Sequence, residues 1–231
     1  TDSTPDPAMV DMFNAMVDEM FEYGRFILKE KRKNPANDLL SAIANAEING
    51  EKLSDEFLDG SWLLIIFAGN DTTRNTMSGG IKLLHENQEQ KEMLINDLEL
   101  LPNFINETVR CVSPVIHMRR TSLEETEING QKIGPYEKIA LWYGAANRDP
   151  SVFEDPNKFN ILRDNADKHL AFGIGRHTCI GKPIALMQLQ EFYSQFLVRF
   201  QDFEMNGDWK VAPNNFVHAI QEMPIKYSPE N

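Results

Sequence analysis

A cysteine inside a glycine-rich loop is the first feature of this sequence that could do chemistry. The stretch AFGIGRHTCIG places Cys179 among Gly173, Gly175 and Gly181, with Phe172 ahead of it. Glycine loses much conformational freedom on folding, so a cluster of it predicts a sharp turn or the close approach of something large. Because the thiolate is the reactive form of cysteine, a large group beside this sulfur would be its ligand or partner. The alternative is an inert buried thiol, the commoner fate of a lone cysteine.

An acid and two hydroxyls interrupt an otherwise apolar segment. WLLIIFAG, residues 62–69, is apolar on every face and predicts a helix segment that is buried all round. The overlapping stretch AGNDTT then places Asp71 and Thr72 where a core helix would carry leucine. Two interpretations are open. In one, Asp71 and Thr72 are functional. In the other, the glycine makes a packing contact and the Asp71 and Thr72 side chains bond back to the helix backbone.

A third stretch, ETVR, places Glu107 and Arg110 three residues apart on one face of an expected helix. This spacing allows an ion pair, which by itself would be a surface pair of little energetic value. Cys111 has no glycines around it, and we expect it to be an inert thiol. One pair of cysteines in a cysteine-poor chain is typical of a reducing cytoplasm.

The elements that position these residues are mainly helical. Apolar residues at three- and four-residue steps predict a helix from Met9 towards Lys31, and we expect its stripe of Met9, Met12, Phe13, Met16 and Met20 to be core. Ser54 is a natural N-cap for the long apolar helix, and Pro183 suits the first turn of the helix after the cysteine loop. The predicted helices cover about 9–31, 38–46, 54–85, 86–100, 102–111 and 181–200.

Short strands are expected after residue 113, where the pattern changes to brief alternating stretches. Two or three strands are predicted between 115 and 145, with a hairpin turn at Asn129 and Gly130. The chain ends in the strand-like stretches NFVHAI and MPIKYS. The sequence therefore predicts a mainly α fold with small β-sheets.

Composition excludes some classes of function. The 231 residues are 42% hydrophobic and 25% charged, as in a globular protein. The net charge of -12 argues against nucleic-acid binding through a broad basic face. No apolar run is long enough to span a membrane and no signal-peptide pattern opens the chain, so we expect a cytoplasmic protein.

Taken together, the motifs resemble those of bacterial cytochrome P450 enzymes. FGIGRHTCIG is similar to the haem-binding signature of that family, AGNDTT to the oxygen-activation motif of its long central helix, and ETVR to its Glu-x-x-Arg motif. The three motifs occur in the family order, and Arg119 follows ETVR as the family's propionate-binding arginine follows its Glu-x-x-Arg motif. Four matched features in order make chance a poor explanation. The resemblance implies the cytochrome P450 fold, with residues 1–231 as the C-terminal, haem-binding portion of a single domain.

The cofactor implied by this resemblance is haem b, iron protoporphyrin IX. Cys179 would be the axial thiolate ligand of the iron and so the metal-binding residue. Gly173, Gly175 and Gly181 would let the loop lie flat against the porphyrin and aim N–H groups at the sulfur, and Phe172 would shield it. The start of the following helix would stabilise the thiolate.

The resemblance also assigns catalytic roles to Asp71 and Thr72, which would deliver protons to dioxygen through ordered water. Ala68 and Gly69 would leave room for O₂ through a local bulge of the helix.

Two further roles follow from the resemblance. Glu107 and Arg110 would be structural, tying the proximal side of the haem to the loop before the cysteine. Arg119 and His177 would bind the haem propionates, since arginine suits carboxylate recognition.

Partners and substrate are implied less directly. Arg176 and Lys182 flank the cysteine loop and would form a basic docking patch for an acidic ferredoxin, supplied in turn by a ferredoxin reductase. The substrate would be a hydrophobic small molecule, namely an alkane, a terpene, a fatty acid or a sterol side chain. His117 has a propionate as its alternative partner. The pocket candidates are Leu64, Phe67, Ala68, Val115, His117, Phe216 and Val217.

Three functions are thus expected in order of preference. The first is a haem-thiolate monooxygenase that uses O₂ and electrons from a ferredoxin. The second is a truncated, non-catalytic haem-binding fragment, because the resemblance implies that the N-terminal part of the family fold is absent; an isolated fragment would have poor stability. The third is a peroxide-using haem-thiolate enzyme, against which the Asp71–Thr72 pair argues.

Overall fold

The computed structural model describes residues 6–228. The chain forms two compact units, Thr1–Gly69 and Asn70–Asn231, and each is described by itself. The long helix α3 (Asp55–Glu86) contributes its first half to one unit and its second half to the other.

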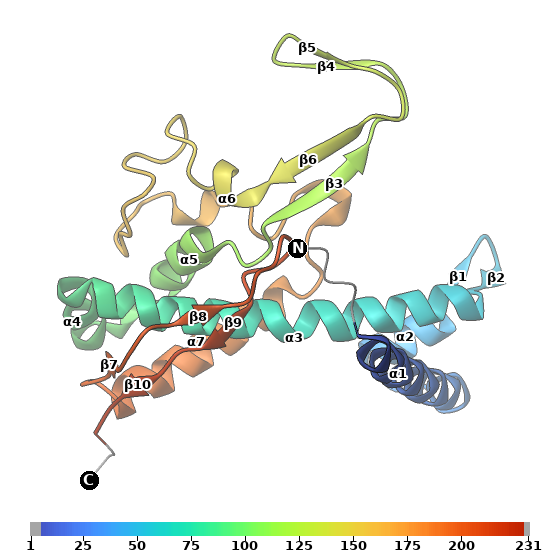
Figure 1. Ribbon diagram of the computed structural model, residues 1–231, viewed down its shortest axis with the longest axis horizontal. Helices are drawn as coiled ribbons and strands as arrows, with labels where there is room; N and C mark the ends of the chain where they lie inside the picture. The colour runs from blue at the N-terminus through green and yellow to red at the C-terminus, as the bar shows by residue number, and fades with distance from the viewer. Residues whose placement is uncertain (1–5, 229–231) are drawn as a thin grey trace. The chain divides into compact units, whose positions relative to one another are not determined.

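The first unit consists of helices and one small hairpin (Figure 1, blue). Helix α1 (Pro7–Lys33) packs on α2 (Leu39–Asn45), whose N-terminus is capped by the Asp38 side chain. Strands β1 (Glu47–Ile48) and β2 (Glu51–Lys52) form an antiparallel pair. The Ser54 hydroxyl accepts a hydrogen bond from the Phe57 N–H at 3.2 Å, which confirms the predicted N-cap of α3.

The core of this unit lies where α1 approaches α3. The Trp62 indole N–H donates to the Met20 carbonyl at 3.0 Å. Gly24 permits this approach, since a methyl group in its place would overlap the Trp62 ring. The buried hydrophobic residues are Leu28, Ala44, Leu58 and Trp62.

Two burial predictions for this unit were wrong. The stripe of α1 is exposed, with Met9, Met12, Phe13 and Met16 each more than 60% accessible. Helix α1 packs instead through the Gly24–Leu28 part of its length, and of the five stripe residues Met20 alone is half-buried. The 62–69 segment is also not buried all round, because only Trp62 faces the core. The residues of this segment that are exposed are Leu63, Leu64, Ile66 and Phe67.

The second unit is built around α5 (Leu101–Val112) and α7 (Lys182–Arg199), which pack on the second half of α3 and on α4 (Gln88–Asn96). The Phe104 and Tyr193 rings meet edge-on at 4.7 Å. The Tyr193 hydroxyl donates to the Thr76 and Met77 carbonyls at 3.1 and 2.9 Å, linking α7 to α3. The predicted helices after residue 54 are confirmed, with a 3₁₀ turn (Leu98–Leu100) separating α4 from α5.

Small two-stranded sheets complete the second unit. Strands β3 (His117–Thr121) and β6 (Lys138–Trp142) pair antiparallel, and beyond them lies the hairpin of β4 (Thr126–Ile128) and β5 (Gln131–Ile133) (Figure 1). Asn129 and Gly130 turn that hairpin with φ of 48° and 80°, as predicted. The short helix α6 (Tyr143–Ala146) and 3₁₀ turns at Ala166–Lys168 and Gly175–His177 follow.

The C-terminal segment forms two more antiparallel pairs, β7 (Glu204–Met205) with β10 (Ile225–Lys226) and β8 (Lys210–Val211) with β9 (Ile220–Glu222). The mainly α fold with small sheets is thus confirmed. Of the helices within residues 6–228, none has the length and apolar composition that a membrane span requires.

Candidate functional site

The cysteine loop folds back on itself through its own backbone. The Cys179 N–H donates to the Phe172 carbonyl at 2.8 Å, and the Thr178 N–H donates to the Gly175 carbonyl at 3.1 Å. Gly173 and Gly175 have φ of 69° and 71°, a conformation that favours glycine. A Cβ atom on Gly173 would lie 3.1 Å from the His177 carbonyl oxygen. The glycines therefore make this turn possible.

The Cys179 side chain is exposed, close to the start of α7 at Lys182. Ile174 and Ile180 beside it are 76% and 78% accessible. A Cβ atom on Gly175 would meet no other atom within 4 Å. The loop thus presents a thiol, open space and an exposed apolar surface together.

Phe172 supports the loop from behind. Its ring packs against the main core of the second unit and lies 5.6 Å from the His169 ring. The Lys182 amine lies 5.5 Å from the Phe172 ring centroid. Two residues before Phe172, the Leu170 N–H donates to the Asn147 side-chain oxygen at 2.6 Å, which attaches this part of the backbone to Asn147.

Glu107 and Arg110 form a fully buried ion pair, and not the surface pair that their spacing by itself would suggest. Both side chains have no accessible surface, and two guanidinium N–H groups donate to the carboxylate at 2.7 Å each. Arg110 also donates to the Asn147 and Pro156 carbonyls, each at 2.8 Å. The pair is buried because the 147–163 loop folds over α5.

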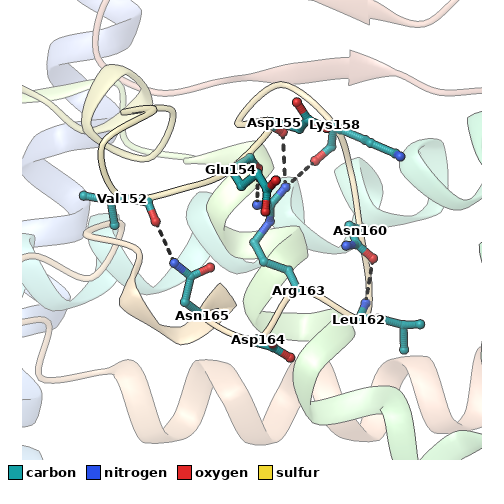
Figure 2. Close-up of a pocket in the computed structure, with 9 residues that line it drawn as sticks. All are labelled: Val152, Glu154, Asp155, Lys158, Asn160, Leu162, Arg163, Asp164 and Asn165. Atoms are coloured by element: carbon teal, nitrogen blue, oxygen red, sulfur yellow. Dashed lines mark hydrogen bonds between the residues drawn. The ribbon is translucent and has the colours of Figure 1, made fainter.

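Arg163 completes this network and was not singled out from the sequence. Its Nε donates to both Glu107 oxygens at 3.1 Å. Figure 2 shows its guanidinium pointing at the carbonyl groups of Glu154, Asp155 and Lys158, which line a polar surface pocket of about 470 Å³. One arginine in a loop rich in Asp, Asn and Pro carries no spacing signal, so only the folded loop reveals its role.

Helix α3 carries Asp71 and Thr72 on a regular backbone. The Asp71 carboxylate accepts a hydrogen bond from Arg74 at 2.6 Å, and the Thr76 hydroxyl donates to the Thr72 carbonyl at 2.8 Å. A Cβ atom on Gly69 would meet nothing within 4 Å. The helix is α-helical throughout Asp55–Glu86, without the bulge expected near Ala68 and Gly69.

Three of the candidate pocket residues come together in the second unit. Val115 forms a β-bridge with Val217, and the Ile116 N–H donates to the Phe216 carbonyl at 2.8 Å. Val217 is buried, with 5% of its surface accessible. Leu64 and Phe67 lie exposed on the half of α3 that belongs to the first unit.

Strand β3 carries His117, a candidate for the substrate pocket, and Arg119, a candidate for propionate binding. Arg119 is exposed and lies opposite Ala140 of β6. The His117 ring contacts Trp142 edge-on at 4.9 Å, and its Nδ1 is buried without a hydrogen-bond partner among the described residues. His177 is exposed in the cysteine loop.

Comparison with known proteins identifies the family. The sequence model of the family described as Cytochrome P450 matches residues 6–228, and the chain therefore belongs to this family. It is 37% identical over 210 residues to a steroid C26-monooxygenase of Mycolicibacterium smegmatis, covering 90% of this chain and 52% of the relative. It is 36% identical over 212 residues to the linalool 8-monooxygenase of Pseudomonas putida, covering 92% and 52%. The chain thus spans about half the length of these curated relatives.

Solved structures show the same likeness. CYP108D1 from Novosphingobium aromaticivorans matches with a TM-score of 0.87 and 32% identity, over 96% of this chain and 54% of that one. CYP109E1 from Bacillus megaterium, in complex with testosterone, matches with a TM-score of 0.82 and 33% identity, over 90% and 58%. The cytochrome P450 fold expected from the motifs is confirmed.

Family membership implies haem b as the cofactor, and the residues present fit it. The exposed thiol, the open space at Gly175 and the bare isoleucines suit a large, flat, apolar group that binds through sulfur. The unpartnered nitrogen of His117 and the exposed Arg119 suit the carboxylates at the rim of such a group.

Proposed function

We propose that this chain is the C-terminal haem-binding portion of a haem-thiolate monooxygenase that hydroxylates a hydrophobic molecule with O₂. The observation that carries the proposal is the exposed Cys179 thiol in a glycine loop of positive φ, ahead of α7. An exposed thiol next to a helix start has the surroundings of a ligand rather than of an inert core residue.

In this proposal Cys179 holds the iron, and Gly173, Gly175 and Gly181 let the haem approach the loop backbone. When bound, the haem supplies the iron and the one-electron chemistry for O₂ that no side chain provides. Phe172, which packs on the core, would keep the loop in place and shield it from that side.

The propionates would be held by Arg119 and His177. Both side chains are exposed and can donate hydrogen bonds to a carboxylate, and Arg119 presents a planar fork that suits one. For His117, a propionate is the alternative to the substrate pocket, supported by its unpartnered buried Nδ1 among the described residues.

Asp71 and Thr72 would move protons to the O₂ side of the haem. The Asp71 carboxylate, which accepts a hydrogen bond from Arg74 through one oxygen, would be the outer group of this path. The Thr72 hydroxyl, one residue on, would pass the proton inward, with Ala68 and Gly69 keeping the helix surface small beside O₂.

The substrate class rests on the apolar side chains and on the names of the relatives. Those names include a steroid C26-monooxygenase, a linalool 8-monooxygenase and a methyl-branched lipid omega-hydroxylase. We propose an alkane, terpene, fatty-acid or sterol side-chain substrate. In the second unit, the lining would come from Val115, His117, Phe216 and Val217.

Electrons would come from a ferredoxin and its reductase. Arg176 is exposed in the cysteine loop and Lys182 lies at the start of α7, so both present positive charge near Cys179. An acidic ferredoxin suits such a patch on a protein of net charge -12. The cytoplasmic location expected from the sequence stays a prediction.

The deciding experiment is the absorption spectrum of the chain after haem loading, reduction and addition of carbon monoxide. We expect the red-shifted Soret band of thiolate-ligated haem, its loss in Cys179→Ala and its retention in Cys111→Ala. A band that survives in Cys179→Ala, or a shift typical of nitrogen ligation in the unchanged chain, would overturn the proposal.

A haem-binding portion without turnover is the second candidate. The exposure of Ile174 and Ile180 beside Cys179 favours it, because water then reaches the surroundings of the thiol. Both functions would give a thiolate-type spectrum. With O₂, a ferredoxin and its reductase supplied, the monooxygenase would hydroxylate a substrate, whereas the haem-binding portion without turnover would give no product. A peroxide-using enzyme would give product with peroxide alone, even in Asp71→Asn.

A further inference from the structure

Asn75 is a fully buried amide on α3, one turn after Asp71 and Thr72. None of its surface is accessible. Its side-chain oxygen accepts a hydrogen bond from the Ile220 N–H at 3.1 Å. Its side-chain nitrogen is buried and has no hydrogen-bond partner among the described residues. Burying an amide nitrogen that makes no hydrogen bond costs free energy, so this residue type is a costly choice for a core position.

The bond from Asn75 ends on the segment that carries Phe216 and Val217. Ile220 is the first residue of β9, and the Ala212 N–H donates to the Ala219 carbonyl at 2.8 Å, which closes the intervening residues into a loop. We call residues 212–220 the C-terminal loop. In Figure 1, β8 and β9 run alongside α3, in agreement with this bond.

The other side of the C-terminal loop is attached to the chain just before β3. The Ile116 N–H donates to the Phe216 carbonyl at 2.8 Å and the His218 N–H donates to the Pro114 carbonyl at 2.9 Å. The loop is therefore bonded both to the 114–116 backbone and to the Asn75 side chain of α3. Backbone bonds tolerate most side-chain changes, whereas the bond between α3 and Ile220 depends on the identity of Asn75.

We propose that Asn75 is a positioning residue that fixes the C-terminal loop, with Phe216 and Val217, relative to the acid–alcohol turn of α3. This inference rests on the proposed function, because that function makes the turn the proton path and the loop part of the substrate wall. Asn75 contacts neither reactant and acts through the loop. It sets which part of an apolar substrate faces the reacting centre.

The test compares Asn75→Leu, which removes the acceptor, with Asn75→Asp, which keeps an oxygen for the Ile220 N–H. Asn106→Leu is the matched control, because its amide nitrogen donates only to Pro102 within its own helix. Amide hydrogen exchange of the chain without added ligand is the first measurement. We expect exchange in the 212–220 segment to accelerate at least tenfold in Asn75→Leu and to be restored in Asn75→Asp. Unchanged exchange in Asn75→Leu would overturn the proposal.

The second measurement is the dissociation constant for linalool, the molecule named by one relative, on haem-loaded protein. We expect a rise of at least fivefold in Asn75→Leu and recovery in Asn75→Asp, while the carbon monoxide spectrum stays the same in all variants. An unchanged dissociation constant would overturn the role in the site. A missing thiolate spectrum in the unmodified chain would count against the proposed function instead, and hydrogen exchange would still decide the role of Asn75 in the loop.

Discussion

The two cysteines have the same side chain in opposite surroundings. Cys179 is exposed in its glycine loop, whereas Cys111 is half-buried on α5 next to Glu107. Burial, together with the neighbouring carboxylate, raises the pKa of the Cys111 thiol to about 11. Because the thiolate is the nucleophile, only one of the two sulfurs is available to a ligand or an alkylating reagent at neutral pH.

Iodoacetamide should therefore distinguish them in the haem-free chain. At about pH 8, near the ordinary pKa of a thiol, we expect a single modification at Cys179, detected by peptide mass spectrometry. Cys111→Ala should be modified at the same rate as the unchanged chain, and Cys179→Ala should remain unmodified. Comparable labelling of both cysteines in folded protein would contradict this assignment.

At the scale of elements, α5 is attached to the loop before the cysteine by charge. The Glu107 carboxylate accepts from Arg110 and Arg163 side chains and from the Asn160 backbone N–H at 2.9 Å. The two arginines in turn donate to carbonyl groups across residues 147–158. A stretch with little regular secondary structure is thereby held in one conformation.

Neutralising the centre of this network should be strongly destabilising, because it leaves two guanidinium groups buried without their partner. We expect Glu107→Gln to lower the free energy of unfolding by about 3–5 kcal/mol in urea titrations followed by circular dichroism. Glu89→Gln on the exposed face of α4 is the control, with an expected change within about 0.5 kcal/mol. A loss below about 1 kcal/mol for Glu107→Gln would show that the network does not hold the loop.

At the scale of the whole molecule, burial of ionisable groups links stability to pH. His169 has 7% of its surface accessible, and its Nδ1 accepts the Ala171 N–H at 3.2 Å. Burial, followed by the charge of Lys182, lowers the pKa of His169 to about 4, against the opposing effect of Asp167. The charge of Arg110 lowers the pKa of His169 further, and the charge of Glu107 raises it.

Stability should fall as the pH falls through this range. Between about pH 6.5 and pH 4 the unfolded chain binds a proton on His169 that the folded chain does not, so acid favours unfolding by up to about 3 kcal/mol. Above about pH 6.5 the contribution is constant. We expect His169→Asn to flatten the dependence of the urea midpoint on pH between 7 and about 4.5, while exposed His177→Asn leaves it unchanged. An equal slope in both variants would exclude His169 as the cause.

Much of this molecule follows from local sequence alone. The helices are set by apolar periodicity and by caps such as Ser54, and the β4–β5 turn by Asn129 and Gly130, because these effects act within a few residues. The order of the motifs around Asp71, Glu107 and Cys179 sufficed to indicate the family and its cofactor. The backbone of the cysteine loop was foreseeable because glycine adopts its positive φ values far more readily than other residues.

Only the tertiary structure decided which of these residues are buried and which segments bury them. The spacing of Glu107 and Arg110 is the same in a surface pair and in a buried one, and the folded 147–163 loop with Arg163 makes the difference. Met9, Met12 and Met16 of α1 repeat like core residues yet lie exposed, since amphipathic periodicity specifies a face and not its partner. Asn75 belongs to no motif, and its bond to Ile220 joins positions far apart in the chain. Local preferences thus determine elements, whereas burial and long-range polar contacts depend on which segments the folded chain brings together.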